Sequence, residues 1–311
     1  MRVYINRMPV PGPWGGGSKI LAAVIDELNA RGHWLTNDLN YADAYVCFDP
    51  RENHRYADYR ILRSIATLRK KPLIQRVGDL GTHGKPELTE LLKSTLNKSD
   101  LLIFPSEYAK DYFKGEFESS KAVVVPNGPM KCFYEHRNEN LSLQSETLRI
   151  VTHHWSMNEK KGFSTYDHID KSLNLADLKI SMTYIGRLPE NLTFRQIKHV
   201  SPMDESQLAI TLPTFDVYLT ASEGEAGANH VLEAAAAGLP ILASFNGGSI
   251  PEYCRKFGVI YGSFNPSMLD CLRDIRDHYQ SYKTSVLQYN RTVSDTAHEI
   301  VEAILEVTSQ Y

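Results

Sequence analysis

Two glutamates in the second half of the chain are candidates for binding the hydroxyl groups of a ligand. Glu225 lies in a glycine-rich loop, and Glu233 comes eight positions later, beside a run of four alanines. Carboxylates accept charge-assisted hydrogen bonds, which suits the hydroxyl groups of a sugar or a ribose. Positions i and i+8 lie about 12 Å apart along a helix axis, so we expect the two carboxylates to bind different parts of one ligand. The alternatives are an acidic helix start for Glu225 and a surface position for Glu233.

The backbone between these glutamates is suited to an anion. Gly227, Ala228 and Asn229 bring small side chains to the expected start of a helix. The first N–H groups of a helix have no partners within it, and the helix dipole favours negative charge at this end. A diphosphate is therefore the expected ligand of these amides.

A lysine stands at the start of another expected helix. Lys161 directly precedes Gly162. A cation at this end of a helix is unfavourable unless an anion also binds there. We expect Lys161 to contact the same diphosphate, and the alternative is a solvated pair formed by Lys160 and Lys161.

Glycines near the amino terminus are a weaker candidate for ligand binding. Gly15, Gly16 and Gly17 precede an expected helix, and glycine lets backbone N–H groups approach a phosphate or sugar closely. Their spacing is not that of a dinucleotide-binding loop. We expect Gly16 and Gly17 to contact the phosphate or sugar of the same ligand, and a flexible loop is the alternative.

Elements that would position these residues follow an alternating pattern. Short apolar runs alternate with segments of helical periodicity, which predicts β-α units around parallel sheets, an α/β fold. Strands are expected at residues 3–6, 44–48, 72–76, 101–105, 121–125, 148–152, 179–185, 217–220 and 240–243. Helices are expected at residues 18–29, 56–70, 87–98, 106–113, 163–173, 206–211, 229–237, 268–279 and 294–309. Ligands of such sheets bind beyond the carboxyl ends of the strands, where the candidate residues fall.

The length of the chain, 311 residues, suits about two domains. The stretch at residues 135–146 is polar and reads as a linker. We therefore expect an N-terminal domain at residues 1–138 and a C-terminal domain at residues 147–311, whose last helix could pack back on the first domain.

Composition excludes several protein classes. The net charge of −3 gives no bulk attraction to nucleic acid or anionic lipid. The densest basic group reads as a solvated helix face or as a docking surface for an anionic acceptor or a membrane; its members are Arg60, Arg63, Arg69, Lys70 and Lys71. The four cysteines read as reduced core thiols, not as a zinc site. No apolar run approaches membrane-spanning length and no secretory leader is evident, so a cytoplasmic location is expected.

Residues 222–252 resemble the glycosyltransferases of family four. The shared order is E-x7-E at Glu225 and Glu233, a small-residue helix, a G-x-P turn at Gly238, and a glycine pair before a Pro-Glu at residues 251–252. Weaker matches in the same order are RGH at residues 31–33, PNG at residues 126–128 with Phe133, and KG at residues 161–162. The resemblance implies the GT-B fold, with two Rossmann-like domains that face a central cleft.

That resemblance also implies an activity. A retaining hexosyl- or related glycosyltransferase of this type moves a sugar from a nucleotide-diphosphate sugar, which is a co-substrate, and needs no other cofactor. Glu225 would bind the sugar, Glu233 the ribose, and Lys161 the leaving diphosphate. Asp79 and His83 match the histidine or aspartate that the family places near the donor sugar. No metal is expected, because no Asp-x-Asp motif occurs in the chain.

One departure from the family concerns the diphosphate. The family has an arginine about five residues before the KG lysine, and Ser156 stands there in this chain. Another cation, such as Arg187 after Gly186, would have to replace it. The missing arginine leaves open a non-catalytic protein that binds nucleotide sugars. An epimerase or a phosphorylase on the same fold is a further alternative, although neither has a motif here.

The sequence does not specify the sugar, the base or the acceptor. Glycans, lipid-linked glycans, small molecules, proteins and modified nucleic-acid bases all fit the fold as acceptors. No transmembrane segment is expected, and peripheral contact with a membrane remains open.

Overall fold

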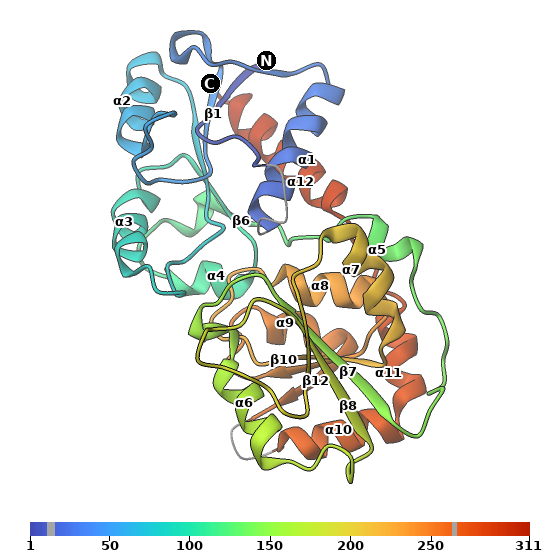
Figure 1. The fold of residues 1–311 in the computed structure, drawn as a ribbon. Helices are drawn as coiled ribbons and strands as arrows, with labels where there is room; N and C mark the ends of the chain where they lie inside the picture. The colour runs from blue at the N-terminus through green and yellow to red at the C-terminus, as the bar shows by residue number, and fades with distance from the viewer. Residues whose placement is uncertain (11–15, 263–265) are drawn as a thin grey trace. The chain divides into compact units, whose positions relative to one another are not determined.

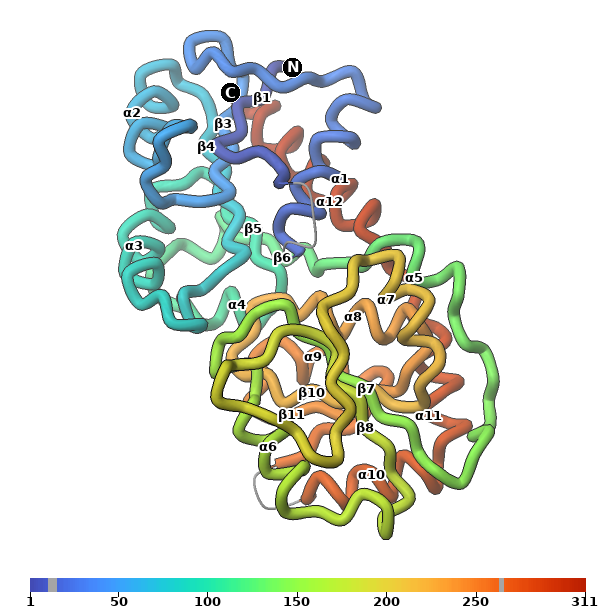
Figure 2. Tube along the Cα trace, in the orientation of Figure 1, coloured from blue at the N-terminus to red at the C-terminus, as the bar shows by residue number. Residues whose placement is uncertain are grey.

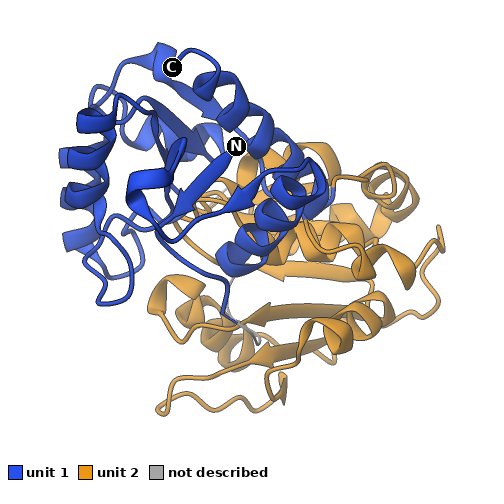
Figure 3. Ribbon diagram, turned by 90° about the horizontal axis from the view of Figure 1, so that it is seen from above, with its two compact units in different colours: residues 1–11, 15–128, 292–311 blue, residues 12–14, 129–291 orange. Residues whose placement is uncertain are grey.

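The computed structural model describes residues 1–10, 16–262 and 266–311 (Figure 1). The chain divides into two compact units (Figure 3). Of the described residues, unit 1 holds 1–10, 16–128 and 292–311, and unit 2 holds 129–262 and 266–291. The chain thus passes between the units at Gly128/Pro129 and at Arg291/Thr292, and not within the polar stretch at residues 135–146.

Unit 1 is built on a parallel sheet with the strand order β2-β1-β3-β4-β5-β6. The strands are β1 (Arg2–Ile5), β2 (Trp34–Leu35), β3 (Ala44–Cys47), β4 (Leu73–Arg76), β5 (Leu101–Phe104) and β6 (Ala122–Val124). The helices are α1 (Gly16–Ala30), α2 (Tyr59–Arg69), α3 (Pro86–Leu96), α4 (Glu107–Tyr112) and α12 (Val293–Thr308), with 3-10 turns η1 (Leu39–Tyr41) and η2 (Ser119–Lys121). Every residue of β3, β4 and β5 is buried, as expected of parallel strands covered on both faces.

The last helix belongs to unit 1 and packs beside the first (Figure 2). Arg31, which follows α1, pairs with Glu27 at 2.7 Å and with Glu302 of α12. At the start of α12, Thr296 Oγ1 donates to the Pro126 carbonyl at 2.8 Å. A Cβ on Gly128 would lie 2.1 Å from the Thr292 carbonyl oxygen, so this close approach requires glycine. The RGH and PNG matches of the sequence therefore serve, at least in part, to attach α12.

Unit 2 is built on a second parallel sheet with the order β12-β11-β10-β7-β8-β9. Its strands are β7 (Leu148–His154), β8 (Ile180–Gly186), β9 (Lys198–Val200), β10 (Val217–Thr220), β11 (Ile241–Ser244) and β12 (Gly258–Tyr261). Its helices are α5 (Cys132–Glu135), α6 (Phe163–Ser172), α7 (Glu205–Thr211), α8 (Asn229–Ala236), α9 (Ile250–Phe257), α10 (Met268–Asp277) and α11 (Tyr279–Val286), with 3-10 turns η3 (Glu159–Lys161) and η4 (Leu212–Thr214).

Strand order in unit 2 reverses between β7 and β10. From β7 at the centre, the chain adds β8 and then β9 toward one side of the sheet. It then returns to the centre and adds β10, β11 and β12 in turn toward the other side. At such a switch point the loops after the two central strands diverge, and ligands of open parallel sheets bind there. The loops that carry Lys161 and Glu225 are the ones that follow β7 and β10.

A buried lysine fixes the turn that ends α8. The Lys283 side chain in α11 is fully buried, and its Nζ donates to the Gly238 carbonyl at 2.5 Å. Burial lowers the pKa of Lys283 to about 8. Gly238 has a φ of +84°, which favours glycine, and leads directly into β11. The G-x-P part of the family motif is thus the turn that Lys283 contacts. No helix in the described part of the chain is both long enough and apolar enough to span a membrane.

Candidate functional site

Lys161 is positioned by a short turn beyond the carboxyl end of β7. Residues 159–161 form a 3-10 turn that Asn158 caps by accepting from the Lys160 N–H at 2.9 Å. Gly162 follows with a φ of +84°, and a Cβ there would lie 2.4 Å from the Ala221 carbonyl oxygen. Only glycine fits this contact, so the KG pair brings Lys161 against the loop that follows β10.

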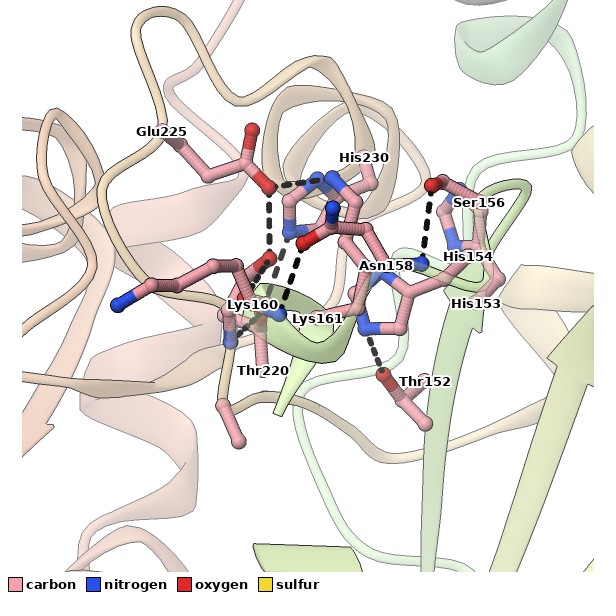
Figure 4. A network of polar contacts seen from close by, with 12 residues as sticks. Thr152, His153, His154, Ser156, Asn158, Lys160, Lys161, Thr220, Glu225 and His230 are labelled. Atoms are coloured by element: carbon pink, nitrogen blue, oxygen red, sulfur yellow. Dashed lines mark hydrogen bonds and ion pairs between the residues drawn. The ribbon is translucent and has the colours of Figure 1, made fainter. Parts of the chain in front are cut away.

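Glu225 and Lys161 form a nearly buried ion pair. Lys161 Nζ lies 2.5 Å from Glu225 Oε1, and the two side chains are 13% and 12% exposed. Ser222 Oγ donates to the same carboxylate oxygen at 2.6 Å. Sequence analysis assigned Lys161 to the diphosphate and Glu225 to the sugar. The structure brings these two groups together in one network (Figure 4).

The glycine pair of the family motif holds the backbone of Glu225. Gly248 forms a parallel bridge with Glu225, and a Cβ on Gly248 would lie 2.6 Å from the Glu225 N and O atoms. The Glu225 N–H donates to the Gly247 carbonyl at 3.2 Å, and the Ser249 N–H donates to the Glu225 carbonyl at 2.9 Å. The loop after β11 therefore fixes the loop after β10.

Gly227, Ala228 and Asn229 lie where the sequence places them. Asn229 is the first residue of α8, and Ala228 is the residue before it. Alanine has no side-chain oxygen to cap this helix end, unlike the serine, threonine, aspartate or asparagine usual at this position. The arrangement is compatible with an anion at the start of α8.

Glu233 is buried two turns into α8, with a partner that sequence analysis did not identify. Its side chain is 10% exposed, and Glu233 Oε2 lies 2.9 Å from His153 Nε2. Because an ionised carboxylate only accepts, the His153 Nε2–H is the donor. The bond orients the Glu233 carboxylate at the end of β7.

His153 is part of a buried aromatic group at the end of β7. The His153 and His230 rings lie 6.2 Å apart at 88°, and the His154 and His230 rings lie 5.0 Å apart at 68°. His154 Nε2 lies 2.9 Å from the Tyr166 hydroxyl, which accepts from the Ala221 N–H at 3.0 Å. Burial lowers the pKa of His230 to about 3, so this imidazole is neutral at neutral pH.

Arg187 follows β8, and its guanidinium lies over the Trp155 ring, 4.2 Å from the ring centroid. Trp155 directly precedes Ser156, the position where the family has arginine. Gly186 pairs with His154 in register, and a Cβ on Gly186 would lie 2.0 Å from the His154 carbonyl oxygen. The ends of β7 and β8 thus bring Arg187 next to the position of the missing arginine.

The remaining site predictions fall in unit 1. Asp79 pairs with Lys85 at 2.7 Å and accepts from the Gly81 N–H at 3.0 Å. Burial alone would raise the pKa of the Asp79 carboxyl, but these two donors outweigh it, and the pKa lies below its ordinary value. His83 is half-buried in the same loop.

Gly16 and Gly17 form the first turn of α1, where a Cβ on Gly17 would meet nothing within 4 Å. Gly15 lies outside the described residues. These predicted residues belong to unit 1, whereas Lys161 and Glu225 belong to unit 2. Within residues 1–10, 16–262 and 266–311, no group of three or more His, Cys, Asp or Glu residues is arranged to hold a metal ion.

Comparisons with known proteins are informative at the level of structure. No protein-family model matches this chain, and no curated protein matches it by sequence. Among solved structures, WaaG, a glycosyltransferase involved in lipopolysaccharide biosynthesis, has a TM-score of 0.68 at 13% identity, over 98% of this chain and 99% of WaaG. The chain has the GT-B fold.

Two further structures with the GT-B fold cover all of this chain. A glycosyltransferase from Rickettsia africae has a TM-score of 0.64 at 14% identity, over 99% of its own length. HepE from Anabaena, solved with UDP and glucose, has a TM-score of 0.61 at 11% identity, over 98% of its own length. The predicted two-domain α/β architecture is therefore confirmed.

Proposed function

We propose that this chain is a glycosyltransferase of the family-four type, which moves a sugar from a nucleotide-diphosphate sugar to an acceptor with retention of configuration and without a metal. The Lys161–Glu225 pair carries this proposal, because it stands at the switch point of the unit 2 sheet with both side chains nearly buried. The GT-B fold supports it, since WaaG and the structure from Rickettsia africae are glycosyltransferases. Retention rests on the resemblance of residues 222–252 to the family.

In the proposed complex, the donor lies along the carboxyl edge of the unit 2 sheet. The diphosphate contacts the start of α8 and Lys161, whose Nζ turns from Glu225 toward the phosphate. Glu225 then accepts hydrogen bonds from the sugar hydroxyls, while Glu233 accepts from the ribose hydroxyls. Lys161 and the amides at the start of α8 stabilise the negative charge that develops on the leaving phosphate.

Transfer requires that one proton move from the acceptor hydroxyl. The bond from the anomeric carbon to the phosphate oxygen breaks, and the acceptor oxygen forms a bond to the same carbon. The leaving phosphate takes the acceptor's proton, so no separate protein base is needed. Unit 1 would bind the acceptor in this scheme.

A thermal-shift screen of UDP-, GDP- and ADP-sugars tests donor binding first, because a ligand that binds only the folded chain raises the melting temperature. Slow donor hydrolysis without acceptor then tests catalysis. Donor binding without any hydrolysis or transfer would favour a non-catalytic nucleotide-sugar binding protein, the alternative suggested by Ser156. A screen with no stabilising nucleotide sugar would contradict both.

Metal independence has its own test. The absence of an Asp-x-Asp motif and the presence of Lys161 support charge stabilisation by the protein alone. We expect full turnover after treatment with EDTA. Loss of turnover that Mg²⁺ or Mn²⁺ restores would contradict this part of the proposal.

A further inference from the structure

Arg76 is a buried cation at the centre of the unit 1 sheet. It is the last residue of β4, and only 6% of it is exposed. Arg76 Nη2 donates to Asn127 Oδ1 at 3.0 Å, and the guanidinium lies 5.7 Å from the centroid of the Phe48 ring. A Cβ on Gly78 would lie 2.3 Å from Arg76 Nη1, so the absence of a side chain at Gly78 makes room for the guanidinium. Segments after β3, β4 and β6 thus hold this group at the carboxyl edge of the sheet.

The neighbouring cations at this edge have carboxylate partners. Arg51 pairs with Asp49 at 2.7 Å, and Lys85 pairs with Asp79 at 2.7 Å. Arg76 differs, because no Asp or Glu in the described ranges forms an ion pair with it; its only protein hydrogen-bond partner there is the neutral Asn127 amide. Burial lowers the pKa of Arg76 to about 10, so the guanidinium remains charged at neutral pH.

An uncompensated charge in a buried position is unfavourable, and proteins normally pair such groups. Removing the arginine would therefore relieve the folded chain of a desolvated cation. Its position at the carboxyl edge of a parallel sheet is the position where ligands of this architecture bind. A guanidinium presents a planar fork of donors that matches the oxygens of phosphate or carboxylate.

We propose that Arg76, positioned by Asn127 and Phe48, binds an anionic oxygen group of the phosphate or carboxylate class on the second substrate. The anion site rests on the unit 1 residues alone. Its assignment to the acceptor rests on the proposed function. The acceptor chemistry is then a sugar phosphate, a phosphate-linked glycan or an acidic sugar, and not a neutral glycan alone.

The test compares melting temperatures of the full chain in inorganic phosphate, in acetate and in chloride at constant ionic strength. It is made in the Lys161→Ala background, which removes the proposed diphosphate contact of unit 2. We expect stabilisation by phosphate, by acetate or by both, and loss of this stabilisation in Arg76→Gln. Arg76→Lys keeps the charge without the fork, so its affinity for the same ion should fall about tenfold, as a lost bidentate contact would cause.

Arg63→Gln is the matched control. Arg63 lies in α2 and pairs with Asp100 at 3.8 Å. Asp100 directly precedes β5, so this pair lies at the amino edge of the sheet, opposite to Arg76. This variant should keep the anion response, and whatever response it shares with Arg76→Gln measures the general effect of the salt. The anion that acts identifies the class, phosphate or carboxylate. Equal responses of Arg63→Gln and Arg76→Gln to both anions would overturn the proposal.

Stability without ligand separates a binding role from a structural one. Because Arg76 is buried without a carboxylate, Arg76→Gln should melt no lower than the native chain. A lower melting temperature together with an unchanged anion response would make Arg76 a structural residue and overturn the site. The stabilisation of Arg76→Gln by nucleotide sugars, measured in parallel in a chain with Lys161 intact, tests the proposed function separately. If nucleotide sugars stabilise neither the native chain nor any variant, donor binding is contradicted, whereas the anion site is unaffected.

Discussion

The two units present cations at the carboxyl edges of their sheets in opposite ways. In unit 2, Lys161 is nearly buried and pairs with Glu225, so its charge is compensated without ligand. In unit 1, Arg76 is more deeply buried, and within the part of the chain that the structure describes its neighbours are an amide and an aromatic ring instead of an ion-paired carboxylate. A paired lysine must exchange its partner when a diphosphate binds, whereas an unpaired arginine gains its first counter-charge from the ligand. The difference predicts that removing Lys161 weakens catalysis and that removing Arg76 weakens anion binding with no loss of stability.

The largest expected effect is on Lys161. Lys161→Ala should lower turnover about 30–1000-fold, since one electrostatic group at a leaving phosphate contributes roughly 2–4 kcal/mol to the transition state. Lys160→Ala is the matched control, because the adjacent Lys160 is 51% exposed and pairs with Glu223 at 2.9 Å. Steady-state kinetics of both variants measure the effect. Equal turnover of the two would remove Lys161 from the mechanism.

The next effect separates the two carboxylates. Glu233→Ala should weaken both the nucleotide sugar and the bare nucleoside diphosphate about 10–100-fold, because a hydrogen bond to a charged group contributes roughly 1.5–3 kcal/mol and the ribose is common to both ligands. Glu225→Ala should not weaken the bare diphosphate, because it releases Lys161 from its partner, and should mainly reduce turnover. Calorimetry with each ligand checks this. Equal loss of both ligands in both variants would contradict the division of roles.

A smaller effect is expected at Arg187. Arg187→Ala should weaken the nucleoside diphosphate about 5–10-fold, since an exposed guanidinium is screened by solvent. Trp155→Leu should have a similar effect, because the ring holds the guanidinium. Arg195→Ala, in the same connection between β8 and β9, is the control, and its backbone bond to Asp170 at 2.7 Å survives the change. If Arg187→Ala and Arg195→Ala bind the nucleoside diphosphate with the same affinity within error, Arg187 does not replace the arginine that the family has at the position of Ser156.

The smallest effect concerns stability in acid. The pKa of His230 is about 3 in the folded chain, below its ordinary value of 6.5. Between these values the unfolded chain binds more protons than the folded chain, so stability rises with pH by up to about 1.4 kcal/mol per pH unit. His230→Asn should flatten this slope between pH 4 and 6, and the exposed His168→Asn should not. Urea unfolding at several pH values measures the free energy of unfolding. If it changes with pH equally in the native chain and in His230→Asn, His230 is not the cause of the pH dependence.

Much of the fold could be predicted from periodicity. The nine strands expected from apolar runs all fall on observed strands, because parallel strands buried on both faces read as continuous apolar segments. Three strands were missed. The strands β2 and β9 have two and three residues, too few for a period, and β12 directly follows α9 with only its last residue buried. The expected helix at residues 268–279 ends at Asp277 instead, and α11 follows it as a separate helix.

Within the candidate site, sequence could identify residue types but not their pairings. Glu225 and Glu233 were found from their spacing, because one local segment carries both. His153 contacts Glu233 across 80 positions of sequence, and Lys161 contacts Glu225 across 64. Such contacts depend on which strands are neighbours in the sheet. Arg76 was overlooked for a related reason: as the last residue of an apolar run, it reads as a strand end, and its burial without a carboxylate is visible only in three dimensions.

The return of α12 to unit 1 has a consequence for synthesis on the ribosome. Unit 1 is interrupted after Gly128, and its closing helix ends at Thr308. At about 5–20 residues per second, the intervening chain takes on the order of 10–40 s to make. Throughout this interval the nascent unit 1 lacks the helix that packs beside α1 and pairs with Arg31. Unit 2 is therefore the first part of the molecule that has its complete sequence available, and the unit that starts first is the last to be finished.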